Sequence, residues 1–580
     1  MKGPKYIFVT GGVCSSLGKG TATASIGALL KAAGFKVCIQ KMDPYLNVDP
    51  GTMSPFQHGE VYVTHDGAET DLDLGHYERF IDENLTELSS VTTGKIYSEV
   101  INKERKGTFL GGTIQIIPHI TNAIQDAIQN AAMQAKADIM MVEIGGTVGD
   151  IEGLPFLEAI RQMRYRLGHE NTLFIHLTLL PYLAASKELK TKPTQASVRE
   201  LRSIGIQPDF IIARADAKIS KDLLKKISMF CDVSEECVIP GTTVKSIYEV
   251  PLIYEEYKIT ELIAKKLNLG KVKPDMRLWK EFVKEIHTKR PPLKIGLVGK
   301  YTKLEDAYLS VIESLKIACY HNKRKLKLTW IDSEKLEARD KTAWQELKSM
   351  DGMVVPGGFG VRGIEGKIAA ARYARENKVP YLGLCLGMQI MTIEFARHAL
   401  NDPKITSEEF DEECKLDKSK YIIHFLPGQS HARAKGGTLR LGAYPCKLVK
   451  DTLAHKLYKK DLIEERHRHR YEFNNNYLAP LEKHGFRASG IYQKEKLVEI
   501  AEISSHPFMI GSQFHPEFLS RPLRPHPFFD GLIKASITPS AAHAVRRRRT
   551  QAPETKGREA TPPGGHRRYK QAAPQAHRPI

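Results

Sequence analysis

Three residues that lie far apart in the chain carry the groups of a cysteine hydrolase: a thiol, an imidazole and a carboxylate. Cys385 lies where the apolar run 380–384 turns into a helical pattern that starts at Met388. A cysteine at such an elbow lies at a helix N-terminus, where the helix dipole favours the thiolate. His515 and Glu517 are two residues apart, so in an extended segment both point to one side and Glu517 can orient the imidazole. Each residue alone is more often structural, but together they predict nucleophilic catalysis.

A glycine-rich segment near the N-terminus has the layout of a phosphate-binding loop. Residues 6–20 begin as an apolar strand-like run, break at two glycines and end in Gly-Lys-Gly, and a helical pattern spans 22–33. This layout points backbone N–H groups and Lys19 at a polyphosphate. Five residues rather than four separate Gly12 from Gly18, so a tight turn with a surface lysine is the alternative. The position between a strand and a helix favours phosphate binding.

The residue after the lysine has a consequence for metal binding. Because Gly20 replaces the usual hydroxyl residue, carboxylates must supply more of the Mg²⁺ coordination, and Mg²⁺ prefers oxygen ligands. Two candidates follow: the acidic cluster 66–73, which includes Asp73, and Glu143, which ends the apolar strand 139–142. A carboxylate at the carboxyl end of a buried parallel strand faces the ligand crevice of an open α/β sheet. For the cluster 66–73, the alternative is a solvated loop.

Functional groups this far apart in the sequence must be positioned by sheets, and the sequence predicts two sheets. Residues 1–267 alternate apolar runs with helical patterns, which indicates βαβ units and a mainly parallel sheet. Residues 268–292 are polar and basic and predict a linker, after which residues 293–536 begin a new βα pattern. Residues 537–580 have no apolar period and contain four consecutive arginines, so they predict a disordered tail.

The overall composition is that of a soluble protein with more than one domain. The 580 residues are 42% hydrophobic and 26% charged. No apolar run is long enough to predict a membrane span, and the N-terminus has no signal-peptide pattern. The eight cysteines form no CxxC pair, which favours reduced thiols in a cytoplasm. The net charge is +19, but ten Lys/Arg and two Glu put +8 of it in residues 537–580.

Three further polar stretches are candidate ligand loops. Residues 43–55 hold three prolines and a glycine, which forbid regular structure, and polar loops near a phosphate site are good ligand loops. Lys190 and Lys192 could hold a second polyphosphate, although a solvated charged turn explains them equally well. The basic run 466–472 suits a solvated face, a nucleic-acid patch or a substrate carboxylate. Its lack of interleaved aromatics argues against base stacking, and beside a Cys-His site the carboxylate is the most economical partner.

These stretches together closely resemble one enzyme family, CTP synthase, the glutamine-dependent amidotransferase that makes CTP from UTP. The matching strings include VTGGVCSSLGKG at 9–20, DPYLNVDPGTMSP at 43–55, HGEVYVTHDGAETDLDLGHYERF at 58–80, KTKPTQ at 190–195, GLCLGMQ at 383–389, RHRHRYE at 466–472 and QFHPEF at 513–518. The resemblance covers about residues 4–535 and is to bacterial-type enzymes. It implies an α/β fold with an N-terminal P-loop-like parallel-sheet synthetase domain and a C-terminal class I glutamine amidotransferase α/β domain.

The resemblance implies overlapping nucleotide sites in the first domain. The ATP site would comprise Ser16, Leu17, Gly18, Lys19, Gly20, Thr21, Lys41, Asp73 and Arg214, and Mg²⁺ would be held by Asp73 and Glu143. The UTP site would comprise Ser15, Lys190, Thr191, Lys192, Pro193, Thr194, Gln195 and Lys226. CTP would share the triphosphate site and inhibit by feedback, with its ring near Asp150, Ile151, Glu152, Arg161 and Phe230.

In the second domain the resemblance implies a glutaminase. Cys385 would be the nucleophile, His515 the acid/base and Glu517 its orienting partner, with backbone N–H groups of Gly358 and Leu386 as the oxyanion hole. Glutamine would be held by Gly358, Leu386, Gly387, Met388, Gln389, Glu409 and Arg470. His58 and Val61 would belong to the gate of an internal ammonia passage, and residues 436–442 resemble a lid associated with GTP activation. The family also implies a homotetramer and allows filaments.

The chain departs from the usual family pattern at four positions. Cys14 replaces a common valine, Thr21 an aliphatic residue, and His65 an acidic residue. Thr243 stands where an aspartate is common, which puts details of adenine or ribose binding in doubt. Two rival functions remain. Another amidotransferase, such as a cobyrinic acid amide synthase, leaves residues 58–80 and 190–195 unexplained. A nucleic-acid-binding or scaffold protein leaves the Cys-His-Glu set and both nucleotide loops unexplained.

Overall fold

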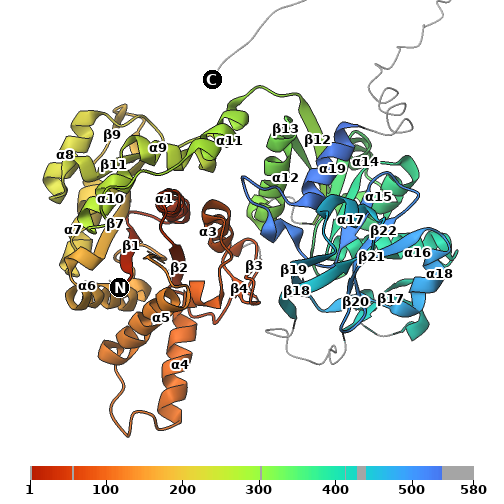
Figure 1. Ribbon diagram of the computed structural model, residues 1–580, viewed down its shortest axis with the longest axis horizontal. Coiled ribbons are helices and arrows are strands. Elements are labelled where there is room, and N and C mark those ends of the chain that lie inside the picture. The colour runs from red at the N-terminus through yellow and green to blue at the C-terminus, as the bar shows by residue number, and fades with distance from the viewer. Residues whose placement is uncertain are drawn as a thin grey trace, which may run out of the picture.

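The chain forms two α/β bodies, each built around its own sheet (Figure 1). The computed structural model describes residues 3–51, 53–54, 58–300, 304–411, 413, 415–426 and 439–538. The tail expected to be disordered lies almost wholly outside these residues, and so do residues 436–438 of the lid 436–442. Within the described residues, no helix is long and apolar enough to cross a membrane.

The first sheet has seven strands, and all its pairings are parallel, as the sequence predicts. Its spatial order is β11 (Val238–Thr242), β10 (Phe210–Ala215), β7 (Thr172–Leu179), β1 (Lys5–Gly11), β6 (Ile139–Ile144), β2 (Val37–Asp43) and β5 (Ser90–Thr92). Because the strands are parallel, the segments that follow them meet at one edge, where an open α/β sheet binds ligands.

Helices cover both faces of this sheet, and alternation along β1 explains why. Ile7 and Val9 belong to one buried cluster, and Tyr6 and Phe8 to the other, because successive strand residues point to opposite faces. The first face packs against α1 (Lys19–Ala32), α3 (Asp73–Ile81), α8 (Lys221–Cys231), α9 (Val250–Glu256) and α10 (Ile259–Lys266). The second packs against α4 (Thr93–Arg105), α5 (Thr121–Gln134) and α6 (Leu154–Leu167).

Three smaller elements complete the first body. Helix α7 (Lys192–Ser203) packs beside α8 and β7. Two short antiparallel ribbons, β3 (Tyr62–Val63) with β4 (Glu69–Thr70) and β8 (Tyr182–Leu183) with β9 (Glu188–Leu189), precede α3 and α7. Figure 1 shows that the ribbon β3–β4 faces the second body, beside β18 and β19.

The second sheet has nine strands and is mixed. Its order is β13 (Lys325–Asp332), β12 (Pro292–Gly299), β14 (Gly352–Val355), β15 (Tyr381–Leu384), β23 (Met509–Ser512), β22 (Leu497–Ile503), β21 (Phe486–Tyr492), β18 (Arg440–Leu448) and β19 (Leu462–His469). The first five run parallel, and the last four extend the sheet by antiparallel pairs. A separate small sheet contains β16 (Thr406–Ser407), β17 (Tyr421–Phe425) and β20 (Tyr471–Phe473).

Helices again cover both faces of the second sheet. One face packs against α13 (Ser333–Glu337), α14 (Lys341–Lys348), α15 (Ile364–Asn377), α16 (Leu386–Ala399) and α18 (Leu478–Glu482). The other packs against α12 (Leu309–His321), α17 (Leu453–Tyr458) and α19 (Pro527–Ile537). This layered arrangement confirms the predicted fold class.

The stretch expected to be a linker contains a helix, α11 (Arg277–His287). Its residues Trp279, Phe282 and Val283 are buried in the core cluster of the first body. Trp279 Nε1 also donates a hydrogen bond to the backbone oxygen of Tyr248 at 2.7 Å. The segment is polar overall, but it carries an apolar stripe at helical spacing. Because this stripe is buried, most of the segment packs as part of the first body.

Candidate active sites

The cysteine elbow has the strained geometry that its sequence suggests. Cys385 connects β15 to α16 with φ 49° and ψ −103°, a conformation that L-residues rarely adopt. A Cβ on Gly383 would lie 2.5 Å from the backbone of Gly387, and a Cβ on Gly387 would lie 1.9 Å from the oxygen of Val355. Both glycines are therefore required by close backbone approach, which holds the thiol at the helix N-terminus.

His515 and Glu517 reach the same place from the next strand. Strand β23 pairs with β15, and the Cys385 N–H donates to the Ser512 oxygen at 2.7 Å, so the two strand ends are adjacent. His515 Nδ1 lies 2.8 Å from Glu517 Oε1, as the spacing predicts. The expected extended backbone is wrong, however, because the short helix Pro516–Leu519 begins directly after His515. Pro516 fixes φ for a helical first turn, which folds Glu517 back onto the imidazole.

The charge state of His515 follows from its neighbours. Burial lowers its pKa, but the Glu517 carboxylate and the Cys385 side chain outweigh burial and raise the pKa to about 10. The imidazole is therefore protonated near neutral pH beside the cysteine sulfur. Gln513 Nε2 also lies 3.5 Å from that sulfur and can donate to it.

Cys385 opens into a cavity of about 220 Å³ between the two bodies. The second body contributes Cys385, His515 and Gly358 to the lining, and the first body contributes Val61 and Glu60. The cavity thus connects the cysteine to the segment predicted to gate an ammonia passage.

Of the residues predicted to hold glutamine, Gly358 lines this cavity. Glu409 Oε1 accepts a hydrogen bond from the Gly360 N–H at 2.7 Å, which ties it to the loop after β14. Gln389 is buried and donates to Gln513 Oε1 at 3.1 Å, so it packs beneath the site. Sequence reasoning missed Lys367, whose ammonium is buried near Gly358 without a hydrogen-bond partner among the described residues. Burial lowers the pKa of Lys367 to about 7.

The glycine loop of the first body lies between β1 and α1, as predicted. Gly18, at the N-cap of α1, has φ 82°, and the helix begins at Lys19, three residues before the predicted start. Lys19 Nζ donates to the Gly146 oxygen at 2.7 Å, so the lysine points along the carboxyl edge of the sheet. Burial lowers the pKa of Lys19, against the pull of Glu143.

Carboxylates converge beside this lysine. Asp73, the first residue of α3, pairs with Lys41, and Glu143 accepts a hydrogen bond from Tyr77. A Cβ on Gly20 would lie 2.2 Å from Asp73 Oδ1, so the absent side chain makes room for the carboxylate. The sequence predicts that a carboxylate replaces the missing hydroxyl as a metal ligand. In the structure, the Asp73 carboxylate occupies the space that a side chain at position 20 would need.

Two further carboxylates belong to the cluster: Asp71, from the predicted acidic stretch 66–73, and Asp43, which the sequence did not single out as a metal ligand. Lys41 Nζ lies 3.7 Å from Asp43 and 3.3 Å from Asp71. Asp66 and Glu69, from the same acidic stretch, pair elsewhere: Asp66 with the Glu87 N–H and Glu69 with Arg468. Asp43 is the last residue of strand β2. A search of the sequence for carboxylates at the carboxyl ends of strands would therefore have found it.

The electrostatics of this cluster suit a divalent cation. Burial raises the pKa of Asp43 and of Glu143 to about 7, although Lys41 favours both charged forms. Burial also raises the pKa of Asp71, but Lys41 and His58 outweigh it and hold the value below the usual range. Several carboxylates thus share the two cations Lys19 and Lys41. The carboxylate donors are all oxygen, the ligand type that Mg²⁺ prefers.

His58 connects the two sites. Its Nε2 lies 3.2 Å from Asp71 Oδ2, inside the carboxylate cluster. Three residues later, Val61 lines the cavity that contains Cys385. One short segment therefore spans from the cysteine cavity to the cluster beside Lys41.

The residues predicted for UTP and CTP lie along one side of this edge. Thr191 and Lys192 stand at the start of α7, and Lys192 Nζ lies 5.8 Å from the Phe230 ring. Lys190 pairs with Glu188 and is partly exposed. Asp150 accepts a hydrogen bond from the Thr147 N–H, and Arg161 is bound by Glu158 on its own helix. Ile151 and Phe230 are exposed apolar residues, and Ser15 is exposed in the glycine loop.

The departure at position 243 is compensated locally. Arg214 Nη1 donates to the Gly241 oxygen at 2.9 Å, and the Thr243 hydroxyl donates to Asp216 Oδ1 at 2.7 Å. Asp216 therefore supplies a carboxylate close to the position where an aspartate is common. His65 Nε2 lies 3.5 Å from Glu464 of the second body, and Cys14 is exposed.

The basic run 466–472 is not a solvated face or a nucleic-acid patch. It forms the end of β19 and the start of β20, where Arg466, His467 and His469 are buried. Arg466 reaches into the first body, and Arg468 pairs with Glu69 at 2.8 Å. These arginines are accommodated by buried acceptors of the first body, which the run alone does not reveal.

Comparisons with known proteins agree with this architecture. Residues 5–269 match the family model "CTP synthase N-terminus", and residues 303–535 match "Glutamine amidotransferase class-I". A CTP synthase of Dehalococcoides mccartyi is 56% identical over 92% of this chain and 97% of its own length. One of Caldanaerobacter subterraneus is 55% identical over 92% and 98%. Among solved structures, the glutaminase domain of Trypanosoma brucei CTPS with bound acivicin is 34% identical, with a TM-score of 0.39, and the match covers 42% of this chain and 94% of that one.

A parallel-sheet synthetase domain joined to a class I glutamine amidotransferase domain defines a glutamine-hydrolysing ligase. The chain belongs to the CTP synthase family, which confirms the resemblance found in the sequence.

Proposed function

We propose that this chain converts UTP to CTP in two coupled sites, using ATP and ammonia released from glutamine. The observation that carries the proposal is the continuity between them: the segment 58–61 contacts both the carboxylate cluster and the cysteine cavity. Ammonia is mostly protonated near neutral pH, so a protected passage is needed to deliver it as a nucleophile. Residues 1–267 carry the synthetase site and residues 293–536 the glutaminase site.

The glutaminase step uses the ion pair formed by Cys385 and His515. The thiolate attacks the amide carbon of glutamine, and backbone N–H groups of Gly358 and Leu386 stabilise the oxyanion. The His515 imidazolium then protonates the departing nitrogen, and ammonia leaves. The neutral imidazole next removes a proton from water, which attacks the thioester and releases glutamate. Glu517 keeps the imidazole oriented throughout.

The synthetase step converts uracil O4, which is a poor leaving group, into a good one. ATP phosphorylates O4 of uracil, ammonia adds at C4, and phosphate departs to leave CTP and ADP. Lys19 and the N–H groups of the glycine loop bind the ATP phosphates, and Arg214 lies on the adenosine side. When bound by Asp73 and Glu143, Mg²⁺ would offset the charge of the transferring phosphoryl group. Lys190, Lys192 and Gln195 hold the UTP triphosphate.

Regulation and assembly follow the family. CTP competes at the shared triphosphate position with its ring toward Asp150 and Phe230, and GTP activates through the lid at 436–442. The chain works as a homotetramer. The exposed apolar side chains of Ile151 and Phe230 support a ligand or subunit partner on this surface.

The test separates the two nitrogen sources. Cys385→Ala should make almost no CTP from glutamine, because the nucleophile is gone, but close to the parent rate from ammonium chloride at mildly alkaline pH. CTP formation is followed by absorbance with UTP, ATP and Mg²⁺ present. Lys19→Ala is the matched opposite: it should lose synthesis with both sources and keep part of its basal glutaminase. A folded Cys385→Ala protein that binds UTP but makes no CTP from ammonium would contradict the two-site scheme.

A further inference from the structure

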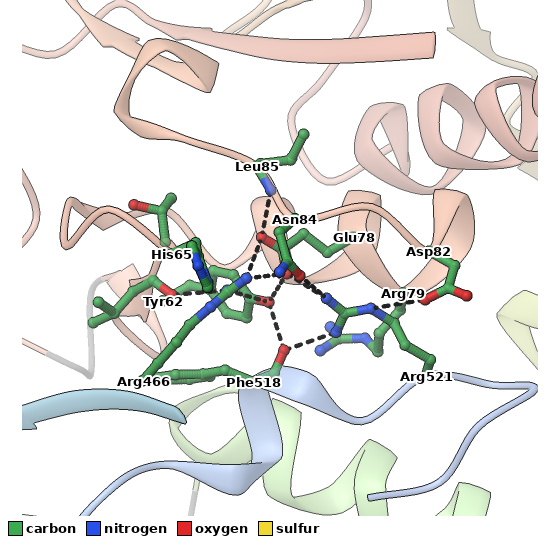
Figure 2. Close-up of polar contacts among 12 residues, drawn as sticks. Tyr62, His65, Glu78, Arg79, Asp82, Asn84, Leu85, Arg466, Phe518 and Arg521 are labelled. Atoms are coloured by element: carbon green, nitrogen blue, oxygen red, sulfur yellow. Dashed lines mark hydrogen bonds and ion pairs between the residues drawn. The ribbon is translucent and has the colours of Figure 1, made fainter. Parts of the chain in front are cut away.

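A buried carboxylate of the first body, Glu78, is the centre of a polar cluster between the two bodies (Figure 2). The side chains of Glu78 and Arg466 are fully buried, and that of Arg521 is 2% exposed. Arg466 lies 3.0 Å from Glu78, and Arg521 lies 2.7 Å from it. Figure 2 shows both arginines reaching Glu78 from segments of the second body. A buried carboxylate that holds two arginines of another domain fixes their relative position strongly.

Both arginines lead to the candidate acid/base. The backbone oxygen of Arg466 accepts a hydrogen bond from the His515 N–H at 2.8 Å. Arg521 Nη1 donates to the backbone oxygen of Phe518 at 2.8 Å, and the Phe518 ring stacks on the His515 imidazole with centroids 5.2 Å apart. The backbone of His515 is therefore tied to Arg466, and its imidazole packs against the Phe518 ring.

Tyr62 reinforces the contact that Arg521 makes with Phe518. Its hydroxyl lies 2.7 Å from Glu78 Oε2 and 3.0 Å from the Phe518 oxygen. Its ring packs 4.8 Å from that of Phe518. Tyr62 stands in β3, next to Val61, which lines the cysteine cavity. The cluster thus touches the passage as well as the imidazole.

The other end of the helix that bears Glu78 belongs to the synthetase site. Helix α3 begins at Asp73, a candidate metal ligand, and Tyr77 on the same helix hydrogen-bonds Glu143, the other candidate. Asp73 and Glu78 are five residues apart, about 7.5 Å along the axis. Seven of the nine helix residues are buried, so the helix can shift only as a unit against its neighbours.

We propose that α3 couples the two sites, with Glu78 as a positioning residue that reports occupancy of the nucleotide and metal site to His515. The inference rests on the proposed roles of Asp73, Glu143 and His515. When nucleotide and metal engage Asp73 and Glu143, the helix settles in one position, and Glu78 sets Arg466 and Arg521 accordingly. His515 then takes the geometry that protonates the departing ammonia. Ammonia is released when an acceptor is present and is not lost to solvent.

Such coupling is reciprocal, which sharpens the test. If the bound nucleotides also favour glutamine binding through this arrangement, then bound glutamine must favour nucleotide binding by the same factor. Cys385→Ala binds glutamine without turnover, so UTP affinity with and without glutamine measures this factor at equilibrium. In the double variant with Glu78→Gln, glutamine should no longer change the UTP affinity.

The main experiment measures glutamate release by the full chain, with and without UTP, MgCl₂ and a non-hydrolysable ATP analogue. The parent should be stimulated about tenfold or more by these ligands. Glu78→Gln should reduce that stimulation at least fivefold, with a larger effect on kcat than on the KM for glutamine, because Glu409 and Arg470 are untouched. CTP formation from ammonium chloride should stay within threefold of the parent. Tyr62→Phe, which removes only a hydroxyl, should lose part of the stimulation and serves if Glu78→Gln does not fold.

The matched control is Glu394→Gln. Glu394 forms a largely buried pair with Arg375 at 2.8 Å, with side chains 4% and 12% exposed, but it joins two helices within the second body. It should keep the stimulation within twofold of the parent. A parent without stimulation, a Glu78→Gln protein that keeps it, or a loss equal to that of Glu394→Gln would overturn the inference. If the parent makes no CTP from either nitrogen source, the proposed function itself fails, which is a separate outcome.

Discussion

The two candidate sites lie at the carboxyl ends of parallel strands in their own sheets, yet they are built differently. The glutaminase site has one acid–base pair on a strained elbow, Cys385 with His515, held by glycines that allow close backbone contact. The synthetase site has no such strained nucleophile. It gathers Lys19, Lys41 and several carboxylates from four elements. A covalent mechanism needs one activated atom, whereas phosphoryl transfer needs many charges in fixed positions.

The largest expected effect tests the synthetase site, where many charged groups lie together. Asp73→Asn or Glu143→Gln should lower CTP formation by at least ~10³-fold with glutamine and with ammonium alike, because both routes need phosphorylated UTP. Basal glutaminase should remain measurable. Rates with both nitrogen sources at several Mg²⁺ concentrations check this. Near-normal synthesis in both variants at ordinary Mg²⁺ would show that the carboxylates do not hold the metal.

The next effect tests the acid–base pair and its pH dependence. Glu517→Gln should lower glutaminase by about 10³-fold, since the imidazole loses its orienting partner. The raised pKa of His515, about 10, means that the imidazolium is lost only as pH rises through that value. Without the Glu517 charge the pKa falls, so the alkaline limb of the glutaminase profile should move to lower pH. An unmoved limb would assign the raised pKa to another group. CTP formation from ammonium is the control and should not change.

A smaller effect tests the steric basis of the synthetase site. Gly20→Ala places a Cβ 2.2 Å from Asp73 Oδ1, so the carboxylate must move. A displacement of about 1 Å can cost ~10²-fold in rate. CTP formation from ammonium should fall by about that factor, with the apparent Mg²⁺ requirement raised. Gly27→Ala, on the same helix, meets mainly flexible apolar side chains and should keep activity within a few fold. Equal losses in both variants would indicate damage to the helix alone.

The smallest effect concerns residues beyond both sites. Deleting residues 537–580 should leave CTP formation within about twofold, a barrier change of roughly 0.4 kcal/mol, because the segment has no periodic apolar face. Steady-state turnover of the truncated chain measures this. A tenfold loss in a folded protein would require a catalytic or assembly role for the tail.

Much of this protein could be predicted from local sequence because local chemistry decides it. The apolar run of β1, followed by the glycine loop, predicts a phosphate site at the edge of a parallel sheet. Gly20 predicts that carboxylates take the place of a hydroxyl as metal ligands. The elbow at Cys385 predicts a thiol at a helix N-terminus. Each of these depends on a few consecutive residues whose backbone geometry follows from glycine and strand propensity.

Other features depend on residues brought together from distant parts of the chain, and only the tertiary structure decided them. The linker at 268–292 looked polar, yet α11 buries Trp279 against the first body. The arginine run left a solvated face, a nucleic-acid patch or a substrate carboxylate open, yet Arg466 is buried against Glu78, a residue 388 positions away. Whether a charge is solvated or paired depends on the acceptor that packing places beside it, and no local pattern contains that acceptor. The sequence by itself therefore determined the residue types and spacings that predict the two chemistries. Only the tertiary structure placed Glu78 of α3 beside Arg466 of β19, between the two bodies.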